Sequence, residues 1–311
     1  MSQEREGPAR NPRLPSMSVH KLSLATVLCF AVLGLAAAHA DAAAYHAYVC
    51  RVPYGPNAGK PASAEATSYS NNSGTTAAES CATGGAMTAG IDGTTTPPYG
   101  HGASVTYETA DGLTISGFRL WRHEAVGPTT ADGTGAPFTY GTYGQAETLV
   151  QPVCSRPGGC TERGTPTSPL DPANLVGVSN LSGVTRVTWR ASCGGVAGGT
   201  CPANGALYSA VYDVYAADML LNDAAPPAAS GIGGPLLAGG TLAGAQSVNF
   251  LATDHGSGVY KGALLVDGVV VTETVLDTVG GACAQFDTAP DGLPAYLNTG
   301  PCRASLDGVL T

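Results

Sequence analysis

The residues that could carry out catalysis do not form a recognisable catalytic motif. The sequence contains no G-x-S-x-G turn for a nucleophilic serine, no H-E-x-x-H zinc motif and no glycine-rich phosphate loop. The E-x-D-x-x-E arrangement of paired carboxylates is also absent, which argues against glycoside cleavage by two acids. A Ser-His-Asp triad can be assembled from distant residues, so the sequence leaves a secreted hydrolase as an alternative. It does not by itself predict an enzyme.

His123 is the histidine with the clearest alternative interpretations. It could act as a base oriented by Glu124 or Asp111, but a histidine at the end of a strand, on the rim of a sheet, is the favoured interpretation. Asp254 and Asp267 could ligate calcium, yet neither loop concentrates the six to eight oxygens that calcium requires. We expect both to form turns, and we expect neither a metal site nor a cofactor.

Aromatic and arginine side chains form the more serious candidate site. Sugar-binding sandwiches stack sugar faces on such rings, while nearby polar groups hydrogen-bond the hydroxyls. The alternative is that these rings fill the core of a chain with only 13 Tyr, 5 Phe and 2 Trp. Trp189 is predicted to be core by its alternation. The candidate ligand-binding residues are Arg119, Trp121, Arg122, Tyr140 and Tyr143.

The charge balance excludes one class of partner. The formal net charge is −9, with 14 basic against 23 acidic side chains. Affinity for DNA comes mainly from Lys and Arg that neutralise phosphates. Nucleic acid is therefore not expected as a partner.

The cysteines indicate a disulfide framework. Of the nine cysteines, Cys29 lies in the N-terminal segment that is expected to be removed as a signal peptide, which leaves eight. An even number in an exported chain is typical of disulfides, and no C-x-x-C or suitably spaced histidine suggests zinc. Locality favours Cys154 with Cys160 and Cys193 with Cys201, because glycine-rich loops lie between them. Cys283 pairs with Cys302 if the C-terminal part is a separate domain, which leaves Cys50 for Cys81. The eight cysteines are Cys50, Cys81, Cys154, Cys160, Cys193, Cys201, Cys283 and Cys302.

The N-terminus reads as a targeting segment. His20 and Lys21 precede an apolar run from Leu22 to Ala38, and Ala-rich sequence then offers cleavage sites of the A-x-A type. The alternative is a membrane anchor, but the run lies at the short end of the spanning range. We expect residues 1–42 to be a signal peptide with an N-terminal extension. The mature chain is expected to be secreted or at the cell surface, with no membrane span after cleavage.

The remaining pattern predicts an all-β chain. With 43 Gly, 22 Pro and 12% charged residues, the composition favours short strands and tight turns over helices. Residues 184–193 alternate between an apolar face that carries Trp189 and a polar face, as in a half-buried antiparallel strand. Six or more such strands in residues 43–223 predict a disulfide-stapled, jelly-roll-like antiparallel β-sandwich.

A second module is expected after a change in composition. Residues 224–240 are rich in Pro, Gly and Ala and read as a domain junction, with a long loop as the alternative. Beyond them, Asp267-Gly268 lies between two β-branched runs, which is a strong hairpin signal. The loop DHGSGV at 254–259 and the hairpin ALLVDGVVV make residues 241–311 resemble bacterial immunoglobulin-like domains. Such domains end in further strands, so the resemblance implies that this one is truncated or a fragment, with an unusual closure of the domain as the alternative.

The whole arrangement is similar to exported actinobacterial surface proteins whose function is not established. The residues that carry this similarity are the segments YHAYVCRVP, GFRLWR and YAADMLLND, followed by the Ig-like unit. It implies a non-catalytic extracellular or cell-surface protein that binds a polysaccharide or cell-wall glycan or mediates adhesion. The alternatives are a secreted hydrolase with an unrecognised site and a purely structural spacer. The sequence does not predict an oligomeric state.

Overall fold

The structure is a computed structural model. It describes residues 43–62, 68–126, 138–144, 149–155, 162–194, 198–278, 283 and 285–311. The expected signal peptide, residues 1–42, and the expected Cys154–Cys160 bridge lie outside the described residues. Among those described, no helix is long and apolar enough to cross a membrane.

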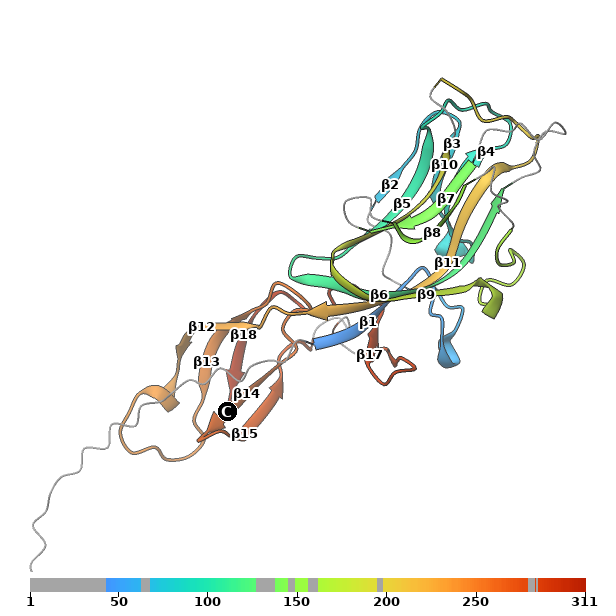
Figure 1. Cartoon of the computed structure of the whole chain (residues 1–311). Helices are drawn as coiled ribbons and strands as arrows, with labels where there is room; N and C mark the ends of the chain where they lie inside the picture. Colours follow the sequence, from blue (N-terminus) through green and yellow to red (C-terminus); the bar gives the residue numbers. More distant parts are fainter. Residues whose placement is uncertain are drawn as a thin grey trace, which may run out of the picture. The chain divides into compact units, whose positions relative to one another are not determined.

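The described chain is all-β, as the composition predicts (Figure 1). Its largest sheet has eight strands. These are β1 (Ala43–Val49), β3 (Thr75–Glu79), β4 (Met87–Asp92), β6 (Leu113–Val126), β9 (Leu175–Val184), β11 (Tyr208–Asp223), β16 (Asp287–Thr288) and β17 (Pro294–Tyr296). The long strand β11 organises this sheet, because β6 pairs with it along one edge, while β4 and then β1 pair along the other.

A second sheet has five strands. In the order of pairing they are β2 (Ser68–Ser70), β5 (Gly102–Glu108), β10 (Arg186–Cys193), β7 (Phe138–Tyr143) and β8 (Leu149–Ser155). Helical segments within the described part are single 3₁₀ turns. They are η1 (Gly55–Asn57), η2 (Cys81–Thr83), η4 (Pro172–Asn174) and η5 (Pro235–Leu237).

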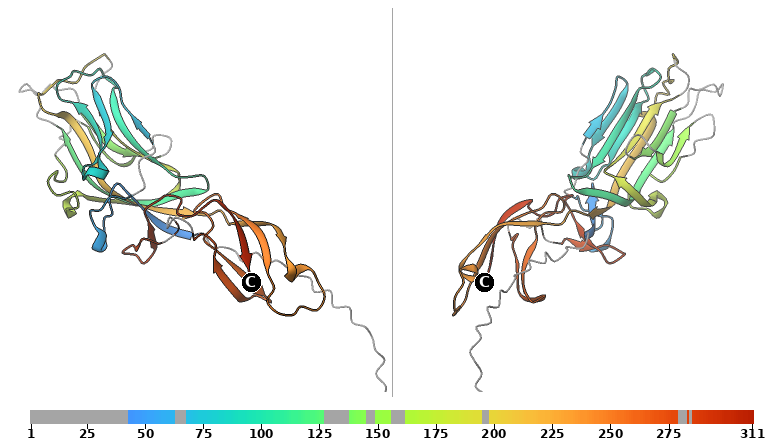
Figure 2. Two further views of the ribbon diagram at one scale, coloured as in Figure 1. Left: turned by 180° about the vertical axis from the view of Figure 1, so that it is seen from behind. Right: turned by 60° about the vertical axis from the view of Figure 1, so that its left-hand side comes forward.

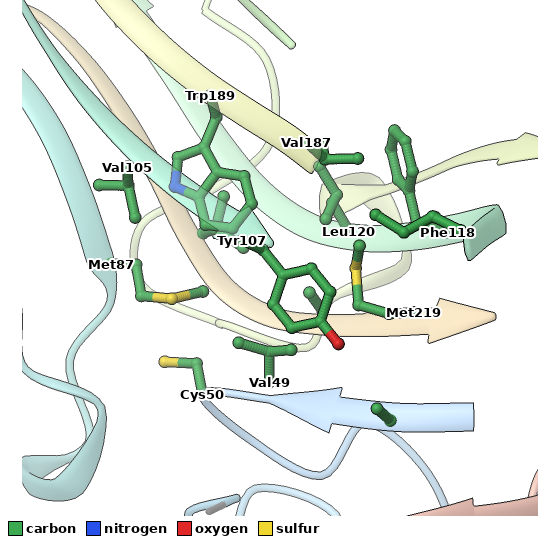
Figure 3. Close-up of a cluster of buried hydrophobic side chains, with 14 of the residues drawn as sticks. Val49, Cys50, Met87, Val105, Tyr107, Phe118, Leu120, Val187, Trp189 and Met219 are labelled. Atoms are coloured by element: carbon green, nitrogen blue, oxygen red, sulfur yellow. The ribbon is translucent and has the colours of Figure 1, made fainter. Parts of the chain in front are cut away.

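The main core lies between these two sheets, so the first module is sandwich-like (Figure 3). Val187 and Trp189 of β10 lie opposite Tyr107 and Val105 of β5, and all four side chains are fully buried. The prediction that Trp189 belongs to the core is confirmed. Burial of such large side chains contributes roughly 1.5–3 kcal/mol each.

The C-terminal strands form two small sheets, whose orange to red strands can be followed in Figures 1 and 2. One contains β12 (Ala228–Gly233), β13 (Val248–Thr253) and β18 (Ser305–Leu310). The other is the hairpin of β14 (Lys261–Val266) and β15 (Val269–Val275). Asp267 and Gly268 both have positive φ at its turn, which confirms the predicted Asp-Gly hairpin. Residues 228–233, which lie within the range expected as a junction, form β12.

Three of the expected disulfides are present, Cys50–Cys81, Cys193–Cys201 and Cys283–Cys302. The segment enclosed by Cys283–Cys302 is not confined to the two small C-terminal sheets. The residues between Cys283 and Cys302 include β16 and β17, and β17 pairs in parallel with β1 of the first sandwich.

Candidate functional site

A β-bulge in β11 places two aspartates on the outer face of the large sheet. The register with β6 shifts between Val214 and Ala216, so Tyr215 is an extra residue in the strand. Without this bulge, Asp213 and Asp218 would point to opposite faces, because they are five residues apart. With the bulge, Tyr212 before it and alternate residues from Ala217 after it pack into the core. Asp213 and Asp218 therefore both face outward.

Asp218 lies in a row of side chains that crosses four strands. Tyr48 of β1 pairs with Asp218, Asp218 with Arg119 of β6, and Arg119 with Gly177 of β9. In the next row Gly117 pairs with Ser179. The two glycines contribute no side chain to this face, so the sheet is hollowed beside Asp218 and Arg119.

The resulting hollow has a volume of about 360 Å³. Its lining combines charged groups with apolar ones, as sites for small polar ligands do. The lining residues are His46, Gly117, Phe118, Arg119, Gly177, Val178, Ser179, Asp218, Leu220 and Asp291.

His46 connects two carboxylates at the wall of this hollow. Its Nδ1 lies 2.5 Å from Oδ1 of Asp218, and its Nε2 lies 3.0 Å from Oδ2 of Asp291. Burial works to lower the pKa of His46, but hydrogen bonds and charge from the two aspartates outweigh it, so the pKa is raised. The imidazolium form donates through both ring nitrogens and therefore satisfies both acids.

The second oxygen of Asp218 is also occupied. The Tyr54 hydroxyl donates to Asp218 Oδ2 at 3.0 Å, and the Arg119 guanidinium donates to the Tyr54 hydroxyl at 3.0 Å. Arg119 itself lies 3.5 Å from Asp218 Oδ2 and is 39% exposed. When His46 is protonated, the wall holds two cations and two carboxylates, which compensate one another.

Aromatic rings pack against Tyr54, which belongs to this charged network. Tyr54 makes edge-on contacts with Tyr48 at 6.0 Å and with Trp121 at 5.3 Å between ring centroids. Tyr48 and Trp121 are buried, so their rings fix Tyr54 rather than offer a stacking surface to solvent.

The structure separates the residues of the predicted site. Arg119 lines the hollow, and Trp121 is on the same face but lies under Tyr54. Arg122 is on the opposite face, where it is 6% exposed. The side chains of Tyr140 and Tyr143 lie outside the described residues, although their backbones pair with Ala191 and Thr188 of β10.

Arg122 and Glu124 form a buried ion pair inside the sandwich. Arg122 Nε lies 2.8 Å from Glu124 Oε1, and Tyr212 is directly opposite Glu124 in β11. The Tyr212 hydroxyl lies 2.7 Å from the hydroxyl of buried Thr142. Burial raises the pKa of Glu124 despite the two arginines near it. Neither Arg122 nor Glu124 is among the residues that line the hollow.

His123 does not share a cleft with Glu124, because consecutive strand residues point to opposite faces. It is buried, with Nε2 2.9 Å from Glu162 and Nδ1 3.5 Å from Asp213. Asp254 accepts backbone N–H groups of Gly256 and Gly258, as a turn-forming aspartate does. No group of three metal-ligating side chains was found within the described ranges.

Sequence reasoning missed the acids and the histidine of the hollow. A usable signal existed for Asp218, a charge within the apolar run AADMLL, and for His46, which alternates with buried Tyr45 and Ala47. No signal pointed to Asp291, which reaches the site only through pairing of distant segments. No known protein family, curated protein or solved structure matches this chain significantly.

Proposed function

We propose that this chain is a non-catalytic, exported binding protein that takes up a neutral glycan in the hollow on the outer face of the eight-stranded sheet. The observation that carries the proposal is the composition of the hollow's wall. Protonated His46 and Arg119 balance Asp218 and Asp291, so in this state the wall offers fixed donors and acceptors without a net charge.

A sugar suits such a wall because each hydroxyl both donates and accepts hydrogen bonds. Leu220, whose side chain is on the outer face, also lines the hollow and would contact the C–H face of a sugar ring. Phe118 and Val178 border the hollow from the core side, because their side chains pack between the sheets. An anionic ligand would meet two carboxylates, and a cationic one would meet two cations. A neutral polyhydroxylated ligand meets neither penalty.

The geometry of His46 supports binding rather than catalysis. A general base needs a ring nitrogen free to accept a proton, whereas both nitrogens of His46 face carboxylates. The paired position of Asp218 would nevertheless orient His46 as a base if Asp291 moved away, and this keeps the hydrolase as the second candidate.

We extend the proposal to the setting of the site. The facing sheets of residues 43–223 support a jelly-roll-like sandwich, and the small sheets after Ala228 support an Ig-like module. Three disulfides and the leader-like residues 1–42 support export and a place outside the cell or on its surface.

Isothermal titration of the mature chain with a panel of neutral and acidic oligosaccharides tests the proposal. Gly177→Leu fills the hollow, because a Cβ at this position meets nothing closer than 3.8 Å and the longer side chain extends into open space. We expect this variant to weaken binding of neutral sugars at least tenfold.

Gly233→Leu is the matched control, since Gly233 lies in β12 of another sheet and an added Cβ there meets only the carbonyl oxygen of Gly231 at 4.0 Å. It should bind as the wild type does. Absence of binding to every sugar would exclude the glycan proposal, and release of shortened oligosaccharides during the titration would favour the hydrolase.

A further inference from the structure

A short segment of the C-terminal part adds two strands to the first sandwich. Residues 285–301, which we call the strap, lie between the disulfide-bonded Cys283 and Cys302. Within the strap, β16 and β17 pair with each other, and β17 then pairs with β1. The pairing with β1 is parallel and covers only two positions, His46 with Ala295 and Ala47 with Tyr296. So short a ladder contributes few backbone hydrogen bonds.

Small apolar side chains complete the contact between the strap and the sandwich. Ala289 and Ala295 pack in a cluster with Tyr48 and Val52 of the sandwich, and all four are buried. Phe286 and Leu297 of the strap pack partly buried against the same cluster, and Thr299 accepts a hydrogen bond from the Tyr45 hydroxyl. The ends of the strap are therefore held by apolar and hydrogen-bond contacts, whereas the turn that carries Asp291 meets the sandwich through a charged contact.

His46 supplies that contact. It is 3% exposed, and it bridges buried Asp218 of β11 to Asp291 in the turn between β16 and β17. Asp291 is 37% exposed and also accepts the backbone N–H of Leu293, which fixes the turn. The same Asp291 side chain is one wall of the hollow.

The other charged and titratable groups around His46 come from every element packed on it. Asp218 and Asp291 contact His46, and Arg119 contacts the buried carboxylate of Asp218. Further acids and phenols lie near the same network. These groups are Asp218 of β11, Asp291 and Asp287 of the strap, Arg119 of β6, Tyr54 of the η1 loop and Tyr48 of β1.

We propose that the strap is a pH-sensitive latch, closed on the sandwich by the charged imidazolium of His46 and released when His46 becomes neutral. A neutral imidazole has one N–H and one lone pair. Asp218 is buried and also held by Tyr54 and Arg119, so it keeps the remaining N–H. Asp291 then faces a lone pair, which repels its carboxylate.

The direction of the pH effect follows from the shifts. The pKa of His46 is raised in the folded protein, so its contribution is complete below the ordinary histidine value and is lost as pH rises through the raised value. The pKa of Asp291 is lowered, because the hydrogen bond and charge of His46 outweigh its partial burial. The latch is therefore closed between these two values and opens above the upper one.

Hydrogen exchange followed by mass spectrometry on the mature, disulfide-bonded chain tests the latch without any ligand. Protection factors, corrected for the intrinsic pH dependence of exchange, are measured for peptides within residues 285–301 from about pH 5 to about pH 9. We expect protection of the strap to fall about threefold to tenfold as pH rises, while protection of β5 and β10 stays constant.

Two variants should remove this pH dependence. His46→Gln and Asp291→Asn are each expected to give strap protection that is low at every pH. Asp307→Asn on the exposed face of β18 is the control and should titrate as the wild type does. If His46→Gln lowers protection of β5 and β10 as well, Asp291→Asn decides, since Asp291 is partly exposed.

A wild-type strap whose protection does not change with pH would overturn the proposal. Unaltered, pH-dependent protection in Asp291→Asn would overturn it as well. Because the experiment uses no sugar, it stands or falls independently of glycan binding.

Discussion

At the scale of single residues, the face of a strand decides what each polar side chain does. Arg119 and Arg122 are three residues apart in β6, yet one lies at the surface hollow and the other is buried with Glu124. Sequence reasoning placed both in one candidate ligand site together with Trp121. Alternation along β6 separates them, and only the position of the second sheet determines which face is covered.

The buried pair gives a prediction for stability. Arg122→Met should lower the free energy of unfolding by about 3–5 kcal/mol, because buried Glu124 loses the arginine in contact with it. Urea unfolding at neutral pH measures this loss.

The double variant Arg122→Met, Glu124→Leu is the control. It should recover most of the loss, since replacing both partners removes the buried charge together with its counterion. A double variant as unstable as Arg122→Met would show that packing, and not charge, accounts for the effect.

At the scale of elements, one inserted residue and two missing side chains build the site. The bulge at Tyr215 brings Asp218 to the outer face, and Gly117 and Gly177 hollow the adjacent strands. Bulges are set by tertiary pairing and were not predicted here.

The two glycines differ in a way that substitution can measure. A Cβ at Gly117 would lie 2.9 Å from the carbonyl oxygen of Val178, whereas the nearest atoms to a Cβ at Gly177 are at 3.8 Å, an ordinary van der Waals contact. Gly117→Ala should therefore destabilise by about 1–3 kcal/mol through overpacking. Gly177→Ala should change stability by less than about 0.5 kcal/mol.

Thermal or urea unfolding of the two variants compares them directly. They lie in neighbouring strands of one sheet, so each controls for the other. Equal losses would mean that backbone freedom, rather than the close approach of Val178, sets the need for glycine at position 117.

At the scale of the whole molecule, the C-terminal part contributes strands to the first sandwich. The strap covers Tyr48 and Val52, and the Tyr45 hydroxyl donates to the carbonyl oxygen of Thr299 at 2.6 Å. Residues 43–223 produced alone would expose these side chains. Residues 43–223 and residues 241–311 are therefore joined by strand pairing and side-chain packing as well as by the continuous chain.

A shortened chain tests this dependence. We expect residues 43–223 to unfold at a midpoint roughly 5–10 °C below that of residues 43–311, because buried apolar surface of Tyr48 and Val52 becomes exposed. Differential scanning calorimetry of both proteins measures the shift.

The full chain with Cys283→Ser and Cys302→Ser provides the comparison. This variant keeps the strap but lacks the disulfide that joins its two ends. The midpoint of its first unfolding transition should therefore lie between the midpoints of the other two proteins. Equal midpoints for residues 43–223 and 43–311 would show that the sandwich does not depend on the strap.

The sequence by itself determined the local features of this protein. Composition and turn chemistry predicted all-β structure, the alternation around Trp189 predicted a core strand, and Asp267-Gly268 predicted a hairpin. Loop closure over short distances predicted Cys193 with Cys201. Each of these depends on neighbours within a few residues, and such preferences are legible in a linear chain.

Only the tertiary structure decided the site and its latch. His46, Asp218 and Asp291 are separated by up to 245 residues, and they meet because β11 pairs with β1 while the strap pairs with the other edge of β1. Their geometry also depends on the bulge at Tyr215. Long-range pairing and register leave no local trace in the chain, because they are set by which distant segments bury surface together.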